Sequence, residues 1–207
     1  MTDDIFRGLN EMQKDALREI GNIGAGNAAT AFSQFLNRKI DMTVPSVEIM
    51  SISDVPEITG NIEEIVAGIL LEVMGEAPAS ILFMIDKDSV EKLVSLVTGK
   101  EVKFDELDDM EISAIKEIGN IISGSYLNAL NKMTNYNMIQ SVPECAIDMA
   151  GAILSSSMIP LSKSSDYALL IKTQFIDGEE KIEGYFFLIP ETGSLKKILE
   201  AIGFDLG

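Results

Sequence analysis

The chain contains one long segment twice, and this repeat limits the folds that it can adopt. Residues 9–45 align with residues 107–143 at a constant offset of 98, without a gap over 37 positions. The identical positions include the run EIGNI, which begins at Glu19 and again at Glu117. Chance does not explain this agreement. We infer an internal duplication, with repeats over about 9–99 and 107–203.

Each repeat is small for a well-packed core, because a short chain buries a smaller share of its surface than a long one. The whole chain has 207 residues, of which 46% are hydrophobic, which is ample for one core. We therefore expect a single domain over residues 1–207, in which the two repeats pack together about a pseudo-two-fold axis.

The order of elements favours an α+β fold. Each repeat is predicted to have a long helix, an extended segment through a proline, two more strands and a final helix. The strands are expected at 40–52, 62–74, 79–86, 138–148, 166–176 and 182–189. The last two strands of each repeat have short connections, so we expect hairpins in a mixed or antiparallel sheet, with the long helices exposed. Residues 150–165 have no counterpart in the first repeat and are predicted to be an inserted short helix and loop.

Composition excludes several classes of function. The net charge is −17, which disfavours nucleic acid and anionic membrane surfaces as partners and favours a basic protein surface. The chain has no His and one Cys, Cys145, which excludes disulfides, most zinc sites and every mechanism with an imidazole base. The N-terminus does not resemble a signal peptide, and no apolar run approaches the roughly 20 residues of a membrane helix. We expect a cytoplasmic protein, and a monomer.

The glycines at 21, 24 and 26 first suggest a phosphate-binding loop. Such a loop follows a strand and opens a helix. Here the preceding residues have helical spacing, no Gly-Lys-Ser/Thr follows, and the second copy has Ile122 in place of Gly24. The phosphate-loop interpretation is therefore disfavoured.

On a helix, one polar stripe appears in each repeat. At 100° per residue, it consists of Asp15, Glu19, Asn22 and Gly26 in the first repeat and of Ser113, Glu117, Asn120 and Gly124 in the second. The apolar residues Met12, Ala16, Ile20 and Ile23 lie on the adjoining face and are predicted to point into the core. The glycines can serve close packing beneath the helix.

The stripe has two interpretations, a solvated helix face and a functional surface. Glu and Asn are identical in the two repeats although their neighbours changed, and Asn inside a helix costs roughly 0.6 kcal/mol relative to Ala. Both facts favour function. The carboxylates are too few for a metal site of the protein's own, so none is predicted. A side-chain amide can, however, orient a water molecule for phosphoryl hydrolysis, provided that a phosphorylated protein substrate brings its own Mg²⁺.

The spacing also matches a known signature, D/S-x3-E-x2-N-x22-P. It is met by Asp15, Glu19, Asn22 and Pro45, and again by Ser113, Glu117, Asn120 and Pro143. The signature belongs to the CheC/CheX/FliY phosphatases of bacterial chemotaxis, and the chain resembles this family over nearly its whole length. Two complete copies in a chain of this length resemble the CheC type.

The resemblance implies hydrolysis of the aspartyl phosphate of the response regulator CheY. Asn22 and Asn120 would align the attacking water, and Glu19 and Glu117 would pair with a regulator Lys. Asp15 and Ser113 would support the helix face, Pro45 and Pro143 would shape the following strand, and the Mg²⁺ would belong to the regulator.

The resemblance also implies regulation by the receptor deamidase CheD. We expect CheD to dock on residues 145–157, with Asp148 taking part, although Asp148 can equally be an ordinary residue at a strand end. An alternative function is a binding or adaptor module that holds phosphorylated CheY or CheD without turnover. The amide in both repeats favours the enzyme, because a module that only binds has no need of it.

Overall fold

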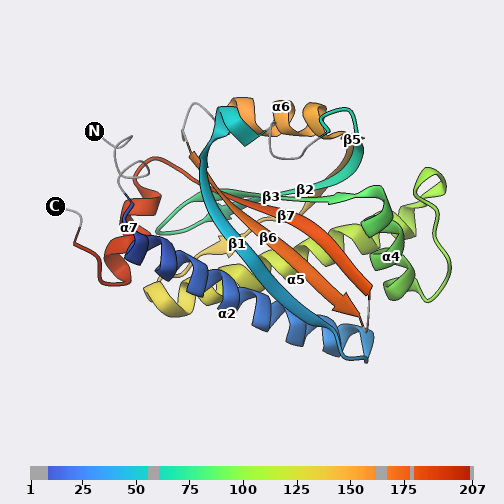
Figure 1. Ribbon diagram of the computed structural model, residues 1–207, viewed down its shortest axis with the longest axis horizontal. Coiled ribbons are helices and arrows are strands. Elements are labelled where there is room, and N and C mark those ends of the chain that lie inside the picture. The colour runs from blue at the N-terminus through green and yellow to red at the C-terminus, as the bar shows by residue number, and fades with distance from the viewer. Residues whose placement is uncertain (1–8, 56–60, 162–166, 178–179, 206–207) are drawn as a thin grey trace.

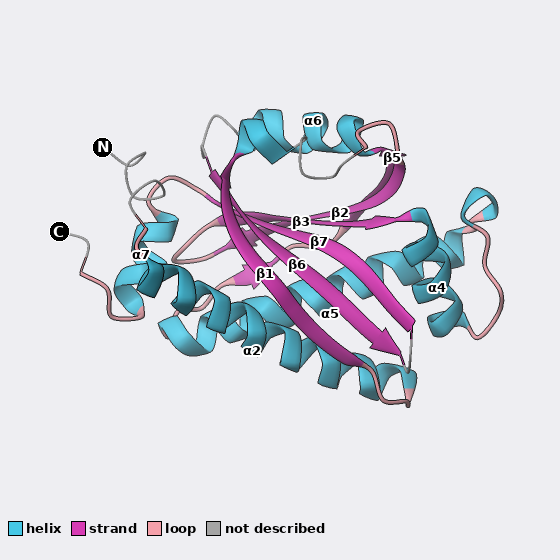
Figure 2. Cartoon of the chain, viewed as in Figure 1, coloured by secondary structure: helices cyan, strands magenta, loops and turns pink. Residues whose placement is uncertain are grey.

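The structure is a computed structural model that describes residues 9–55, 61–161, 167–177 and 180–205. A twisted antiparallel sheet forms its centre, with two long helices on one face and a shorter helix over the other (Figures 1 and 2). The helices are α2 (Glu11–Leu36), α4 (Lys87–Thr98), α5 (Asp109–Thr134), α6 (Ala150–Leu161) and α7 (Ser194–Ala201). The strands are β1 (Asp41–Ser51), β2 (Ile65–Met74), β3 (Ala79–Asp86), β4 (Ile139–Gln140), β5 (Glu144–Met149), β6 (Tyr167–Asp177) and β7 (Glu180–Pro190). The predicted α+β class is confirmed.

The order of the strands follows from the two repeats. It is β1-β6-β7-β3-β2-β4, with β5 also paired to β2, and every pairing is antiparallel. Strand β1 of the first repeat pairs with the second repeat's hairpin, and β5 of the second repeat pairs with the first repeat's hairpin. The order is therefore symmetric about the β3–β7 pair, as the expected pseudo-two-fold axis requires. Because the edge strands are exchanged, each repeat completes its part of the sheet with the other repeat's chain.

One predicted strand is wrong in its extent. The extended segment expected at 138–148 is two short strands, β4 and β5, separated at residues 141–143. Its counterpart β1 runs through Pro45, but its register with β6 shifts between Thr43 and Ser46. Proline has no N–H to donate to a strand ladder, so the ladder is interrupted in both repeats at the proline.

The insertion in the second repeat is confirmed as helix α6, while its predicted loop from 162 lies outside the described residues. Helix α6 covers the sheet face opposite the long helices, where Ile153 and Leu154 join a second apolar cluster. Gly68 on β2 leaves room for it, because a Cβ there would lie 2.7 Å from Ile153 Cγ2. Among the described residues, no helix is both long enough and apolar enough to cross a membrane.

The two long helices begin and end in the same way. Asn10 and Gln13 form a capping box at the start of α2, and Asp108 and Glu111 form the equivalent box at α5. Reciprocal bonds of this kind satisfy backbone N–H groups that the first helical turn leaves without partners. Asn37 and Asn135 end the helices in the left-handed conformation, at φ of 49° and 59°. The repeat therefore fixes both ends of each helix.

The buried face of α2 differs from the prediction at Met12. Ile20 is buried as expected and Ala16 and Ile23 are half-buried, but Met12 is 70% exposed. Met110, its counterpart on α5, is 69% exposed. The buried side of α2 consists of Gln13, Leu17, Ile20, Gly21, Gly24, Ala25, Ala28 and Phe32. This side is rotated around the helix from Met12, which therefore points outward, and its small residues let the helix approach its neighbours closely.

Two of the helix glycines, Gly24 and Gly119, provide this close approach. A Cβ at Gly24 would overlap the ring of Tyr126 on α5, and a Cβ at Gly119 would lie 2.6 Å from Ile69 Cγ2 on β2. Gly21 differs from its counterpart Gly119, because a Cβ there would only make ordinary contact, 3.6 Å from Val47 Cγ2. The same glycine in the two repeats is therefore under different packing constraints.

This difference predicts opposite effects of one substitution. Gly119→Ala should lower the free energy of unfolding by about 1–3 kcal/mol, because Ile69 must move within a packed core. Gly21→Ala should be neutral or stabilising by up to about 1 kcal/mol, because Ala is the better helix former. Urea unfolding of the two variants measures both values. Equal destabilisation by the two would contradict the packing argument.

The capping boxes predict a difference between the helices in acid. The backbone N–H of Glu111 lowers the pKa of Asp108, and the hydrogen bond with Lys100 lowers the pKa of Glu111. Stability from carboxyls with lowered pKa values is present at neutral pH and is lost as the pH falls below about 4. The first turn of α5 should therefore lose protection from hydrogen exchange in acid. The first turn of α2 should lose less, because its capping residues Asn10 and Gln13 are uncharged and its one carboxyl with a lowered pKa, Glu11, is hydrogen-bonded only to Lys14 on the surface.

The double variant Asp108→Asn/Glu111→Gln is the matched control, because it gives α5 the capping residues of α2. It should remove the additional acid sensitivity of residues 109–113 relative to residues 11–15. If the variant keeps that sensitivity, a group other than Asp108 and Glu111 is its cause.

Candidate functional site

Each long helix places its polar stripe outside the core. Asp15, Glu19 and Asn22 are exposed on α2, whereas on α5 Glu117 is exposed and Asn120 is half-buried. Glu and Asn stand one helical turn apart in both repeats, as their spacing predicted. The rigid helices thus hold a carboxylate and an amide at a fixed separation on the surface, twice in one molecule.

The stripe on α2 is open. Asp15 forms an ion pair with Arg18, with 3.1 Å between Oδ1 and Nη1, and both side chains are largely exposed. Within the described part of the chain, the side chains of Glu19 and Asn22 make no hydrogen bond or ion pair. Both groups are therefore available to a binding partner.

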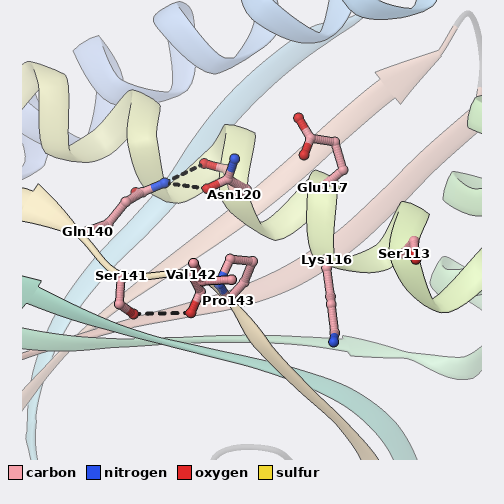
Figure 3. Close-up of a pocket in the computed structure, with 8 residues that line it drawn as sticks. All are labelled: Ser113, Lys116, Glu117, Asn120, Gln140, Ser141, Val142 and Pro143. Carbon is pink, nitrogen blue, oxygen red and sulfur yellow. Dashed lines mark hydrogen bonds between the residues drawn. The ribbon is translucent and has the colours of Figure 1, made fainter.

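The stripe on α5 borders a shallow pocket of about 460 Å³ (Figure 3). The pocket is lined by Ser113, Lys116, Glu117, Asn120, Gln140, Ser141, Val142 and Pro143. The helix supplies one wall, and the segment that joins β4 to β5 supplies the other. Pro143 therefore lies at this second site, while Pro45 is exposed at the ladder irregularity beside α2.

Asn120 has a partner that Asn22 lacks. Nε2 of Gln140 donates to Asn120 Oδ1 at 2.6 Å and to the Asn120 backbone carbonyl at 3.1 Å (Figure 3). Glu117 points away from this pair, and Lys116 extends to the opposite side of the helix (Figure 3). The amide of the second site is thus held in place, and its carboxylate is free to meet a partner.

The two sites also differ beside the Glu–Asn pair. Ser113, the counterpart of Asp15, donates its hydroxyl to the Asp109 carbonyl at 2.8 Å, which satisfies it within the helix. Val142 is 84% exposed, whereas its counterpart Val44 is 8% exposed and packs near Gly21. The second site therefore presents an apolar side chain that the first site buries.

Asp148 lies apart from both stripes, on β5. It is exposed, and its Oδ1 accepts from the backbone N–H of Met149 at 2.8 Å. Ile147 and Met149 beside it are 38% and 44% exposed. Among the residues that the structure describes, strand β5 pairs with β2 alone, so this segment is an edge of the sheet with apolar and acidic side chains in sequence.

Sequence reasoning missed Gln140 and Lys116. Gln140 aligns with Met42 in the first repeat, and Lys116 aligns with Arg18. A polar residue in place of an apolar one, three positions before the signature proline, was a visible signal. The contact between Gln140 and Asn120 depends on how the strand crosses the helix, and an alignment of the two repeats does not show this.

The arrangement suits contact with another protein. Among the residues that the structure describes, no group of three or more His, Cys, Asp or Glu side chains could hold a metal ion. The stripes are open surfaces that offer amide donors and acceptors beside negative charge. Such a surface can dock on a basic partner and insert an amide into the partner's own site.

Comparison with known proteins agrees with the signature. The model of the CheC-like family matches residues 12–49 and 110–146, which are the two signature segments. The CheY-P phosphatase CheC of Bacillus subtilis (strain 168) is 36% identical over 207 aligned residues, which cover 98% of this chain and 99% of that protein.

Solved structures share the fold. The structure of Thermotoga maritima FliY has a TM-score of 0.78 and 25% identity, covering 94% of this chain and 98% of that one. CheX in its complex with CheY, BeF3 and Mg²⁺ from Borrelia burgdorferi has a TM-score of 0.52 at 18% identity, covering 81% and 95% of the two chains. With a full-length relative at this identity and the signature in both repeats, the chain belongs to the CheC-like family.

Proposed function

We propose that the protein is a phosphatase that hydrolyses the aspartyl phosphate of the chemotaxis response regulator CheY. The observation that carries the proposal is the exposed Glu–Asn pair, which recurs one helical turn apart on α2 and α5. The CheC of Bacillus subtilis, a full-length relative, is a CheY-P phosphatase, which supports the same activity here.

In the proposed reaction, Asn22 or Asn120 enters the regulator's site and orients a water molecule. The water oxygen forms a bond to phosphorus while the bond between phosphorus and the aspartyl oxygen breaks. The regulator recovers its carboxylate, and inorganic phosphate leaves as H2PO4⁻, which carries the oxygen and both protons of the water. Orientation and electrostatics supply most of the rate in such reactions, so one amide without a base can suffice.

Glu19 and Glu117 serve as anchors in this mechanism. Each carboxylate is exposed and lies one turn from its Asn, where it can pair with a Lys of the regulator. The regulator also brings the Mg²⁺ that neutralises the phosphoryl oxygens. Asp15, paired with Arg18, and Ser113, bonded within its helix, support the two stripes rather than touch the phosphate.

We further propose that the CheD deamidase docks on the edge strand β5. Exposed Asp148, between Ile147 and Met149, offers a carboxylate flanked by apolar side chains, and an exposed sheet edge can receive an extended segment of a partner. Within the described ranges β5 pairs with β2 alone, and it carries neither stripe, so a partner on its free edge would leave both stripes accessible to CheY. Asp148→Lys should therefore weaken CheD binding without changing basal CheY-P hydrolysis.

Removing both amides tests the phosphatase directly. Asn22→Ala/Asn120→Ala should reduce the acceleration of phospho-CheY decay by about 10²-fold or more, because the water loses its orienting group. The measurement is the rate of phosphate release from phospho-CheY in the presence of Mg²⁺. Asn128→Ala, which removes an exposed asparagine on the same face of α5 about two helical turns beyond Asn120, is the matched control and should behave as wild type.

The result also separates an enzyme from a binding module. If wild type binds phospho-CheY but does not shorten its lifetime, the protein is an adaptor that sequesters the regulator. If the double variant accelerates decay as well as wild type, the amides do not orient the water.

The anchors predict a different kinetic signature. Glu19→Gln/Glu117→Gln should raise KM by about two- to fivefold with kcat little changed, because each exposed ion pair contributes only about 0.2–1 kcal/mol. The wild-type KM should rise with added salt, and that of the variant should rise less. A fall in kcat alone would assign the carboxylates to the chemical step instead.

A further inference from the structure

The orientation of the Asn120 side chain is determined by its contacts. The backbone carbonyl of Asn120 can only accept, so the Gln140 atom that lies 3.1 Å from it must be the amide nitrogen. The same nitrogen lies 2.6 Å from the Asn120 side chain, so the atom that faces it must be Oδ1. One donor thus fixes which end of the Asn120 amide faces the strand and which faces outward (Figure 3).

This contact leaves Asn120 able to act on a water molecule. A carbonyl oxygen has two lone pairs, so Oδ1 can accept from Gln140 and from a water at once. The amide nitrogen of Asn120 makes no hydrogen bond within the described part of the chain. Gln140 therefore restricts the rotamer of Asn120 without occupying its full hydrogen-bonding capacity.

The first repeat lacks this arrangement. The counterpart of Gln140 is Met42, which cannot donate and is 9% exposed. The glycine after each Asn shows the same contrast. A Cβ at Gly124 would lie 3.4 Å from Gln140 Nε2, whereas a Cβ at Gly26 would have no atom within 4 Å. Gln140 fills a space above α5 that is open above α2.

Gln140 is a poor choice for stability alone. Its Oε1 is buried and has no hydrogen-bond partner among the residues that the structure describes. A buried acceptor without a partner opposes folding, and an apolar side chain such as the Met of the first repeat would avoid that cost. The nitrogen of the same side chain donates both hydrogen bonds to Asn120, so the amide of Gln140 acts on Asn120.

We propose that Gln140 is a positioning residue that pre-orients Asn120, so that the second site is preorganised and the first is not. The proposal rests on the proposed phosphatase function. Asn22 must become ordered when the regulator binds, whereas Asn120 is already held in one rotamer. Ordering one polar side chain changes a rate or affinity by about two- to tenfold.

The test isolates each site with an asparagine substitution. In an Asn22→Ala background, only the second site is active, and Gln140→Met should lower kcat for phospho-CheY hydrolysis about two- to tenfold. KM should change little, because Glu117 is untouched. Gln140→Leu, which removes the donor with a different side-chain shape, should have the same effect. In an Asn120→Ala background, Gln140→Met should leave the remaining activity of the first site unchanged.

A second measurement does not depend on activity. In ¹⁵N relaxation of the free protein, the side-chain amide of Asn120 should be more ordered than that of Asn22, and Gln140→Met should remove the difference. Unchanged kcat and unchanged order in the Gln140 variants would overturn the inference. A rise in kcat would also overturn it, because Gln140 would then be sequestering the amide.

Failure of the phosphatase proposal gives a separate result. In that case Asn22→Ala/Asn120→Ala retains full activity, or wild type has none, whatever the Gln140 variants do. Thermal unfolding of the Gln140 variants controls for folding, and we expect them to be at least as stable as wild type, because Met or Leu removes the buried Oε1 that has no partner among the described residues.

Discussion

The exchange of edge strands between the repeats is the constraint on which the rest of the structure depends. Strand β1 completes the hairpin of the second repeat, and β5 completes that of the first. If the two repeats separated, the β1–β6 and β2–β5 ladders would break, and their backbone N–H and C=O groups would lose their partners. The two repeats therefore stay together. The exchange also brings α2 and α5 to the same face of the sheet (Figure 1). On these helices Glu19, Asn22 and Glu117 are exposed and Asn120 is half-buried.

The close packing of the long helices explains why their surfaces are suited to function. Gly24 accommodates Tyr126 of α5, and Gly119 accommodates Ile69 of the sheet. Capping boxes fix the helix starts, so the Glu–Asn pair stands on a rigid support in each repeat. A side chain that must orient one water molecule benefits from such a support, because small displacements at a reacting centre have large effects on rate.

The two sites share a pattern but have different surroundings. The strand after α2 is continuous and buries Val44, while the strand after α5 is broken and exposes Val142. The same break forms a pocket wall, from which Gln140 reaches Asn120. An open site and a preorganised site on one molecule give two ways to engage a single kind of partner. The inserted helix α6 lies on the opposite face of the sheet from the two helices that carry the stripes (Figure 2).

The sequence by itself determined the repeat, the α+β class, the long helices and the stripe of Glu and Asn. These features depend on identity at a constant offset and on local periodicity, both of which are visible along the chain. Tertiary structure decided the outward position of Met12, the unequal packing of Gly21 and Gly119, and the contact of Gln140 with Asn120. Each of these features depends on which distant segment of the chain packs against a given residue. That neighbour is determined by the long-range pairing of strands between the two repeats, and local periodicity does not encode this pairing.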